Sequence, residues 1–149
     1  MKRLESQRLT LKKLETKDAD LIYALYNTKD FLLYIGDKKI DSLELARNYI
    51  QSPIQKMYKD HNVGMCLVER KSDQAKLGVC GLVKREGLDD FDIGFGFLPE
   101  FYGQGYAFEA AKATLNFAEK DLNLKKVVAI TNQDNQPSIK LLSLSLIHI

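Results

Sequence analysis

Two glycines stand between an expected strand and an expected helix, at the place in the chain best suited to chemistry. Residues 90–117 read DFDIGFGFLPEFYGQGYAFEAAKATLNF, with Gly103 and Gly105 in the loop between the two elements. The first turn of a helix leaves backbone N–H groups without partners and carries partial positive charge. Glycines let a bulky anion approach these groups closely. The segment therefore predicts a phosphate-binding loop, and with it a nucleotide or a cofactor that ends in one.

Two common phosphate-binding loops do not fit the residues that follow the glycines. A dinucleotide-binding loop needs a third small residue and an acid at the end of the next strand. Here Phe108 occupies the third small position, and the expected strand Lys126–Ile130 ends in Thr131 and Asn132. A nucleoside triphosphatase loop needs a lysine after the last glycine, but Tyr106 stands there. Both classes are excluded.

Three segments, in order, resemble the GCN5-related N-acetyltransferase (GNAT) family. Residues 102–107 (YGQGYA) match its acetyl-coenzyme A loop, Gln/Arg-x-x-Gly-x-Gly/Ala, except at Tyr102. Residues 98–110 resemble the branch that acetylates the N-termini of ribosomal proteins, which often carries an aromatic residue at that place. Residues 6–19 resemble the family's opening strand and first helix, and residues 131–142 its strand-to-helix motif near the thiol of coenzyme A. The resemblance extends from near the start to about Leu142.

This resemblance implies a single domain over residues 1–149 with an α/β (α+β) fold. The expected architecture is a mixed, mostly antiparallel central sheet with helices on both faces. The implied activity is transfer of the acetyl group of acetyl-CoA to a primary amine, by direct attack in a ternary complex and without a metal. The acceptor is a protein or peptide N-terminus or a small amine. A catalytically weak acyl-CoA-binding protein and an interaction domain that keeps only the fold are the alternatives.

The family's cofactor contacts carry over to specific positions of this chain. Backbone groups of the loop would hold the diphosphate, since no lysine or arginine lies within it, helped at most by Lys112 or Lys140. A glutamate at Gly105 should then block cofactor binding by clashing with the diphosphate. Asn132 and Asn135 would contact the amide arm, or serve in turn and cap chemistry. The implied cofactor-binding set is Phe97, Leu98, Tyr102, Gly103, Gln104, Gly105, Tyr106, Ala107, Asn132 and Asn135.

Acyl transfer to an amine also needs a base, a donor to the thioester oxygen and a proton for the thiolate. Asp92 is the candidate base, acting through water; a surface or bulge-capping aspartate is the alternative. N–H groups of Phe97 and Leu98 would face the oxygen. Leu142 occupies the place of the family's usual tyrosine. The resemblance to the ribosomal-protein branch, in which the helix serine takes that role, implies Ser138 as the proton donor to the thiolate, unless it is only an early helix residue. Gly94 and Gly96 share a strand face with Asp92 and leave a groove for pantetheine, or else relieve a bulge.

Composition sets the remaining expectations. The 149 residues are 45% hydrophobic and 28% charged, with a net charge of +2 and no basic run, which argues against a nucleic-acid binder. No apolar stretch approaches a membrane span, and the N-terminus lacks the core of a signal peptide. Cys66 and Cys80 are expected to be reduced core residues of a cytoplasmic protein, with a disulfide left open. His61 and His148 lack ligand spacing, so no metal site is expected.

Periodicity predicts the elements that position the loop. Thr16 is expected to cap a helix that ends near Asn27. A second helix is expected to start at Asp41 or Ser42 and to break near Pro53, with Gln55–Asp60 as a continuation. The predicted strands are 8–14, 64–69, 76–84, 91–98 and 126–131, and the last two helices follow the glycine loop and Asn135.

The family normally continues past the last of these helices with a glycine turn and two more strands. Residues 141–149 (LLSLSLIHI) contain no such glycine and hold at most one short strand. We expect a chain shortened relative to the family, with an apolar sheet edge that favours a homodimer. The alternative is that a partner copy supplies the missing edge.

Overall fold

The structure, a computed structural model, describes residues 2–34, 37–84, 90–124 and 126–128. Within them, one five-stranded sheet has the order β1-β2-β3-β4-β5, and neighbouring strands are antiparallel. The strands are β1 (Leu4–Glu5), β2 (Leu9–Lys13), β3 (Met65–Arg70), β4 (Lys76–Lys84) and β5 (Phe91–Phe97). Val128 adds a parallel bridge to Asp92. The sheet is therefore mixed and mostly antiparallel, which confirms the predicted fold class.

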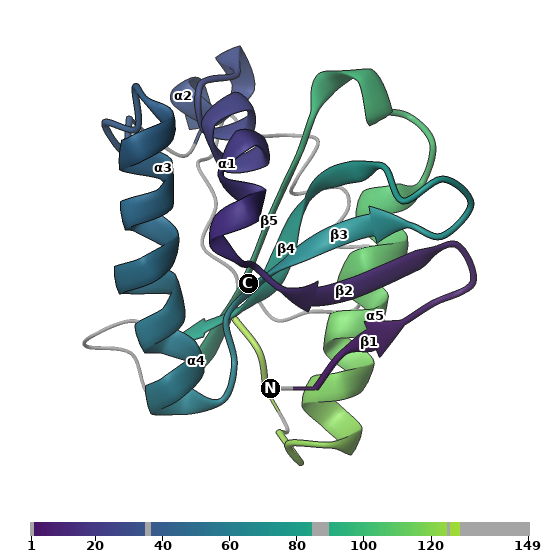
Figure 1. Cartoon of the computed structure of the whole chain (residues 1–149). Helices are drawn as coiled ribbons and strands as arrows, with labels where there is room; N and C mark the ends of the chain where they lie inside the picture. Colours follow the sequence, from purple (N-terminus) through teal and green to yellow (C-terminus); the bar gives the residue numbers. More distant parts are fainter. Residues whose placement is uncertain (1, 35–36, 85–89, 125, 129–149) are drawn as a thin grey trace.

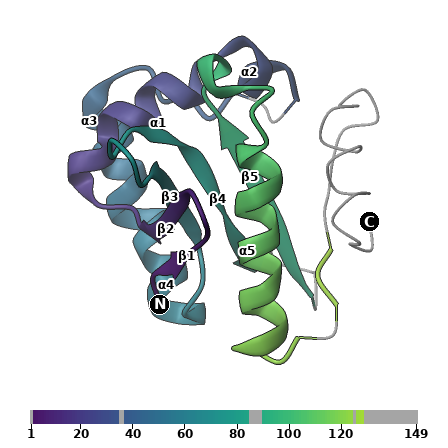
Figure 2. The same ribbon diagram turned by 90° about the vertical axis from the view of Figure 1, so that its right-hand side faces the viewer.

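Helices cover both faces of this sheet (Figure 1 and Figure 2), with α1, α3 and α4 on one face and α5 on the other. Two apolar clusters result. Val68 and Cys80 pack with Ala110 and Ala111 of α5, whereas their strand neighbours Leu67 and Val79 pack in a cluster with α1 and α3. Alternation of side chains along a strand explains the division. The α-helices are α1 (Ala19–Tyr26), α2 (Lys29–Tyr34), α3 (Leu43–Tyr49), α4 (Gln55–His61) and α5 (Tyr106–Lys120).

The start of the first helix differs from the prediction. Thr16 does not cap it but begins a 3-10 turn, Thr16–Asp18, that leads into α1. The Glu15 N–H donates to Asp18 Oδ2 at 2.9 Å, and Lys76 Nζ of β4 lies 3.0 Å from Asp18 Oδ1. Asp18 is the N-cap residue of α1, but its side chain makes no capping hydrogen bond to that helix. The assignment of Thr16 as the cap was therefore wrong.

The predicted interruption of the second helix near Pro53 is a change of helix type, and Gln55–His61 continues the helix as predicted. A π-helical turn, Ile50–Ile54, contains Pro53 and joins α3 directly to α4. A proline inside an α-helix removes one hydrogen bond and clashes with the carbonyl four residues earlier. A turn with i→i+5 spacing is wider and accommodates both effects. The start of α3 is as predicted, because Ser42 Oγ accepts a hydrogen bond from the Leu45 N–H at 3.1 Å.

Tyr58 of α4 ties that helix to two strands. Its buried hydroxyl accepts from the Leu14 N–H at 2.9 Å and donates to the Met65 carbonyl. A phenylalanine at this position would leave both backbone groups without that partner. We expect Tyr58→Phe to lower the free energy of unfolding by about 2 kcal/mol, measured by urea denaturation. Tyr23→Phe, at a residue that is 41% exposed, is the control and should change the midpoint little; equal midpoints for the two variants would contradict the prediction.

The two cysteines are buried thiols, as predicted for reduced core residues. They lie opposite each other in β3 and β4. Burial raises the pKa of both thiols, that of Cys80 to about 12. Neither sulfur is therefore a thiolate nucleophile at neutral pH.

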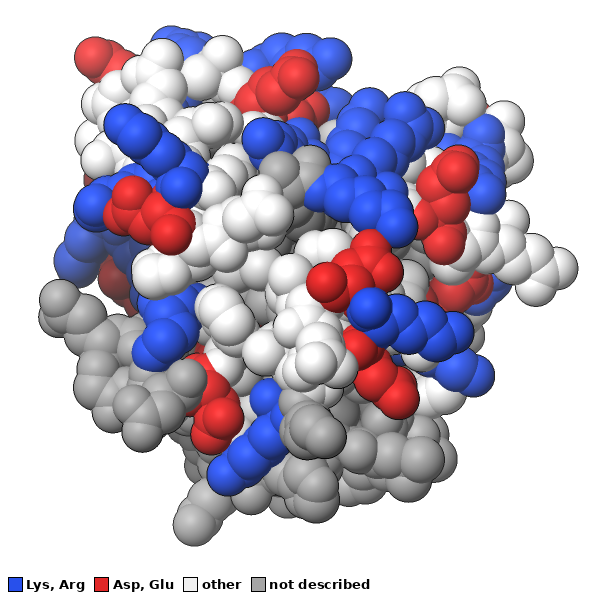
Figure 3. Space-filling view, turned by 90° about the horizontal axis from the view of Figure 1, so that it is seen from below, with Lys and Arg blue, Asp and Glu red and all other residues white. Residues whose placement is uncertain are grey.

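Charged residues of both signs are interspersed on the face seen from below (Figure 3). This mixed distribution accords with the small net charge of +2. Among the helices of the described residues, none is both long and apolar enough to span a membrane.

Candidate functional site

The loop between β5 and α5 is built by a short turn followed by two left-handed glycines. Leu98 donates its N–H to the Leu77 carbonyl of β4 at 3.0 Å, and the 3-10 turn Pro99–Phe101 follows. The Tyr102 N–H donates to the Pro99 carbonyl at 3.1 Å. Gly103 and Gly105 then adopt φ values of 75° and 81°, a region that other L-residues enter only at a cost. The glycines thus allow the sharp entry into α5.

A run of backbone N–H groups lies at this entry. The first intrahelical bond of α5 is from Glu109 N–H to the Gly105 carbonyl, at 3.1 Å. Within the described part of the chain, no acceptor takes a hydrogen bond from the N–H groups of residues 103–108. A Cβ atom on Gly103 would meet nothing within 4 Å. Open space therefore adjoins six donors at the positive end of a helix, an arrangement that suits an anion.

The predicted loop residues occupy different positions around these donors. Tyr106 is buried, Ala107 packs at the edge of the α5 cluster, and Gln104 is exposed. The Tyr102 side chain is 46% exposed and interacts with the Asp30 carboxylate of α2. Burial, followed by that interaction, raises the pKa of Tyr102 to about 12. With the N–H groups of Leu98 and Tyr102 already used, a ligand would meet their side chains or carbonyls.

The outer edge of β5 carries a second set of backbone groups. Because Leu98 N–H bonds to Leu77, Phe97 forms a non-hydrogen-bonded pair with Gly78 of β4. The N–H and C=O groups of Phe97, and likewise of Phe95, therefore point away from β4. Ile93 follows the same rule, because its N–H donates to the Val128 carbonyl at 2.9 Å. Among the described residues, Val128 pairs with one end of this edge, and no segment pairs with Phe95 or Phe97.

Asp92, Gly94 and Gly96 share one face of β5, as the alternation predicts. A Cβ atom on Gly94 would lie 3.5 Å from Met65 Sδ, and one on Gly96 would lie 3.8 Å from Leu25 and Phe31 side chains. Both glycines are partly exposed, whereas Asp92 is only 1% exposed. The face is therefore partly exposed at the glycines, where neighbouring side chains lie at contact distance, and closed over the carboxylate.

Arg8 is a residue of this site that the sequence did not reveal. It immediately precedes β2, and its Nη1 donates to the Gln104 carbonyl at 3.1 Å. Its guanidinium lies 4.4 Å from the centroid of the Tyr106 ring, and its Nε donates to Glu109 Oε1 at 2.7 Å. The loop sequence itself contains no arginine, as expected, but Arg8, immediately before β2, contacts the loop in space.

Glu109 connects the first turn of α5 to the chain before β2. Burial raises the pKa of Glu109, but hydrogen bonds from Ser6 and Arg8 outweigh it and bring the pKa below its ordinary value of 4.5. A carboxylate with a lowered folded-state pKa stabilises the fold above the unfolded pKa, and this contribution is lost as the pH falls through the folded pKa. We expect Glu109→Gln to be less stable than the native chain at pH 7, with the difference shrinking below pH 4.5. Urea midpoints of both proteins across this range measure it; a constant difference would contradict the assignment.

Several predicted features lie outside the described residues. They are Asn132, Asn135, Ser138 and the C-terminal sheet edge proposed for a homodimer.

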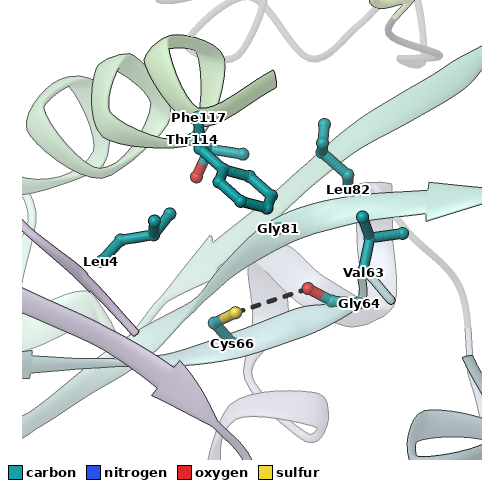
Figure 4. A pocket seen from close by; sticks show the side chains of 8 residues that line it. All are labelled: Leu4, Val63, Gly64, Cys66, Gly81, Leu82, Thr114 and Phe117. Carbon is teal, nitrogen blue, oxygen red and sulfur yellow. Dashed lines mark hydrogen bonds between the residues drawn. The ribbon is translucent and has the colours of Figure 1, made fainter. Parts of the chain in front are cut away.

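An apolar cavity of about 10 Å³ lies between the sheet and α5 (Figure 4). Leu4, Val63, Leu82 and Phe117 line it, and the Cys66 Sγ donates to the Gly64 carbonyl beside it at 3.5 Å. The space suffices for about one water molecule. Phe117 is about 16 Å along the helix from Tyr106. This cavity is therefore a packing defect separate from the glycine loop.

Comparison with known proteins agrees with the geometry of the loop. The model of the acetyltransferase (GNAT) domain matches residues 8–143. The uncharacterized N-acetyltransferase p20 of Bacillus licheniformis is 27% identical over 145 residues, which are 96% of this chain and 80% of the relative. The crystal structure of a GNAT-family acetyltransferase from Bacillus anthracis is 26% identical, with a TM-score of 0.78 over 95% of this chain and 81% of that one.

A further solved structure shares the fold at lower identity. It is RimL, a ribosomal L7/L12 alpha-N-protein acetyltransferase in complex with coenzyme A. It is 17% identical, with a TM-score of 0.83 over 97% of this chain and 83% of that one.

Proposed function

The chain belongs to the acetyltransferase (GNAT) family, and we propose that it transfers the acetyl group of acetyl-CoA to a primary amine. The amine attacks directly while both substrates are bound. An acceptor at a protein or peptide N-terminus is supported by the shared fold of RimL, which acetylates such a terminus. A small amine is the other acceptor of this class.

The observation that carries the proposal is the run of N–H donors at residues 103–108 beside open space at Gly103. A diphosphate is a doubly charged group with many acceptor oxygens, and it suits N–H groups without acceptors at a helix N-terminus. A Cβ atom on Gly103 would meet nothing within 4 Å, so the loop leaves space on that side. These donors would hold the diphosphate of acetyl-CoA.

The outer edge of β5 would hold the pantetheine arm. The backbone groups of Phe95 and Phe97 point to this edge, and the amides of pantetheine can pair with them as a strand would. Of the two donors predicted for the thioester oxygen, the Leu98 N–H is bonded to Leu77. The Phe97 N–H is therefore the better candidate to stabilise the charge that develops on that oxygen.

Asp92 would remove a proton from the attacking amine through a water molecule, since its carboxylate is only 1% exposed. The amine nitrogen then bonds to the thioester carbon, the carbon–sulfur bond breaks, and the sulfur accepts a proton. Ser138 remains the predicted donor to the sulfur, and Asn132 and Asn135 remain predicted contacts of the amide arm.

The burial of Asp92 also favours a second candidate, an acyl-CoA-binding protein with little turnover. If the carboxylate never meets the amine or a water bound to it, the loop would bind the cofactor without promoting transfer. The two candidates share the binding site and differ in the chemical step.

Two measurements test these candidates in order. Calorimetry with acetyl-CoA should give saturable heat, and its absence would refute both. Thiol release is then followed with a panel of peptide and small amines. Release above the rate of hydrolysis supports the transferase, whereas binding without release supports the acyl-CoA binder.

A further inference from the structure

Arg8 contacts the glycine loop at Gln104, the residue between the two glycines and 96 positions later in the sequence. Its Nη1 donates to the Gln104 carbonyl at 3.1 Å. Its Nη2 would lie 3.4 Å from a Cβ atom on Gly105. The guanidinium therefore lies against one side of the peptide that joins Gln104 to Gly105.

That contact determines where the Gly105 N–H points. The Gln104 carbonyl and the Gly105 N–H belong to one peptide group, and the described residues contain no cis peptide bond. In a trans peptide the C=O and N–H bonds point in opposite directions. A carbonyl directed at Arg8 therefore directs the Gly105 N–H away from Arg8.

Without such a contact the orientation of this peptide would be weakly determined. Glycine populates positive and negative φ about equally, and a glycine stands on each side of Gln104. A rotation of the peptide would replace the N–H donor with a carbonyl oxygen, which repels an anion. One hydrogen bond to the carbonyl opposes that rotation.

Arg8 is itself held in place by α5. Its Nε donates to Glu109 Oε1 at 2.7 Å, and its backbone N–H donates to Glu109 Oε2 at 2.8 Å. The ring of Tyr106 lies under the guanidinium. Because Glu109 offsets the positive charge, the main contribution of Arg8 to the loop is direction, not net charge.

We propose that Arg8 is a positioning residue that orients the Gly105 N–H toward the diphosphate of acetyl-CoA. This inference rests on the proposed function of the loop. It assigns the orientation of the loop to a side chain immediately before β2, which does not itself touch the diphosphate.

The test compares Arg8→Lys and Arg8→Met with the native chain. Lysine keeps the charge and can pair with Glu109, but it lacks the planar fork that reaches two acceptors at once. We expect both variants to bind CoA roughly tenfold more weakly, the loss of about one hydrogen bond, measured by calorimetry. In the native chain, CoA should also slow hydrogen exchange of the Gly105 amide, and this protection should be lost in both variants. Lys12→Met, in β2 four residues after Arg8 but paired with Glu69, is the control and should keep both properties.

Each other result overturns the proposal. Native CoA affinity in both variants removes any role for Arg8 in the loop. Native CoA affinity in Arg8→Lys, with weakened affinity in Arg8→Met, shows that the positive charge of Arg8, and not its hydrogen bond to the loop, supports binding. Loss of fold in both variants assigns Arg8 to stability. Failure of the native chain to bind CoA refutes instead the function proposed for the loop, so the two failures are distinguishable.

Discussion

A glutamate in place of Gly103 is expected to lower the affinity for acetyl-CoA by roughly 100-fold or more. A Cβ atom at Gly103 would enter the open space beside the N–H donors, so the carboxylate would occupy the position proposed for the diphosphate. Two like charges a few ångströms apart near a protein surface repel by about 4 kcal/mol. The measurement is calorimetric titration of the variant with acetyl-CoA.

A series of substitutions at Gly103 separates the effect of charge repulsion on binding from the effect of backbone strain. The φ of 75° strains any other residue by about 1–2 kcal/mol, and this cost is common to Gly103→Ala, Gly103→Gln and Gly103→Glu. The affinity of the alanine variant for acetyl-CoA measures the effect of strain alone. The glutamine variant adds the effect of side-chain bulk, and the glutamate variant adds that of negative charge. If glutamate and glutamine weaken binding equally, no anionic group of the ligand lies beside Gly103.

The sequence alone suggested testing a glutamate at Gly105, but the structure shows that Gly103 is the better position. The missing Cβ of Gly105 faces Arg8 Nη2 at 3.4 Å, so a glutamate there would be drawn to the guanidinium. The two glycines have nearly equal φ values but face different surroundings. A pattern of glycines predicts that a loop approaches an anion, yet it does not reveal which glycine faces it.

Local patterns predicted the elements that position the site. The strand at 76–84 and the Ser42 cap follow from alternation and from capping chemistry, both of which act over a few residues. The phosphate-binding interpretation of the glycine loop rests on the same kind of local signal. Features that depend on distant partners were missed or wrong. Asp18, not Thr16, is the N-cap residue of α1, and its carboxylate pairs with Lys76 of β4.

Short elements, and contacts between residues far apart in the sequence, have no periodic pattern from which they could be predicted. The two-residue strand β1 is defined by its pairing with Leu11 and Thr10, and the six-residue helix α2 is too short for a repeating stripe. Arg8 looked like any polar residue at the start of a strand, since its partners Gln104 and Glu109 lie in another part of the sequence. Only the folded sheet, with α5 packed on it, brings these residues together.

Asparagine in place of Asp92 is expected to lower turnover at neutral pH by roughly 100-fold while leaving the affinity for acetyl-CoA unchanged. The side chain is nearly the same size, so the β5 pairing with Val83 should persist, but it can no longer accept a proton. Turnover is measured by thiol release, and affinity by calorimetry. Asp90→Asn, a nearby aspartate that pairs with Lys126 at 3.6 Å, is the matched control and should keep the native rate.

The pH profile of the Asp92→Asn variant distinguishes a base from a structural residue. A protein N-terminus has a pKa of about 7.7–8.0, so its neutral fraction rises as the pH approaches that range. Without a base, the rate should follow this neutral fraction, and the deficit of the variant should shrink as the pH rises. A structural role predicts a deficit that is independent of pH and a lower midpoint in urea. Equal rates in the variant and the native chain would show instead that the amine loses its proton to another group or directly to water.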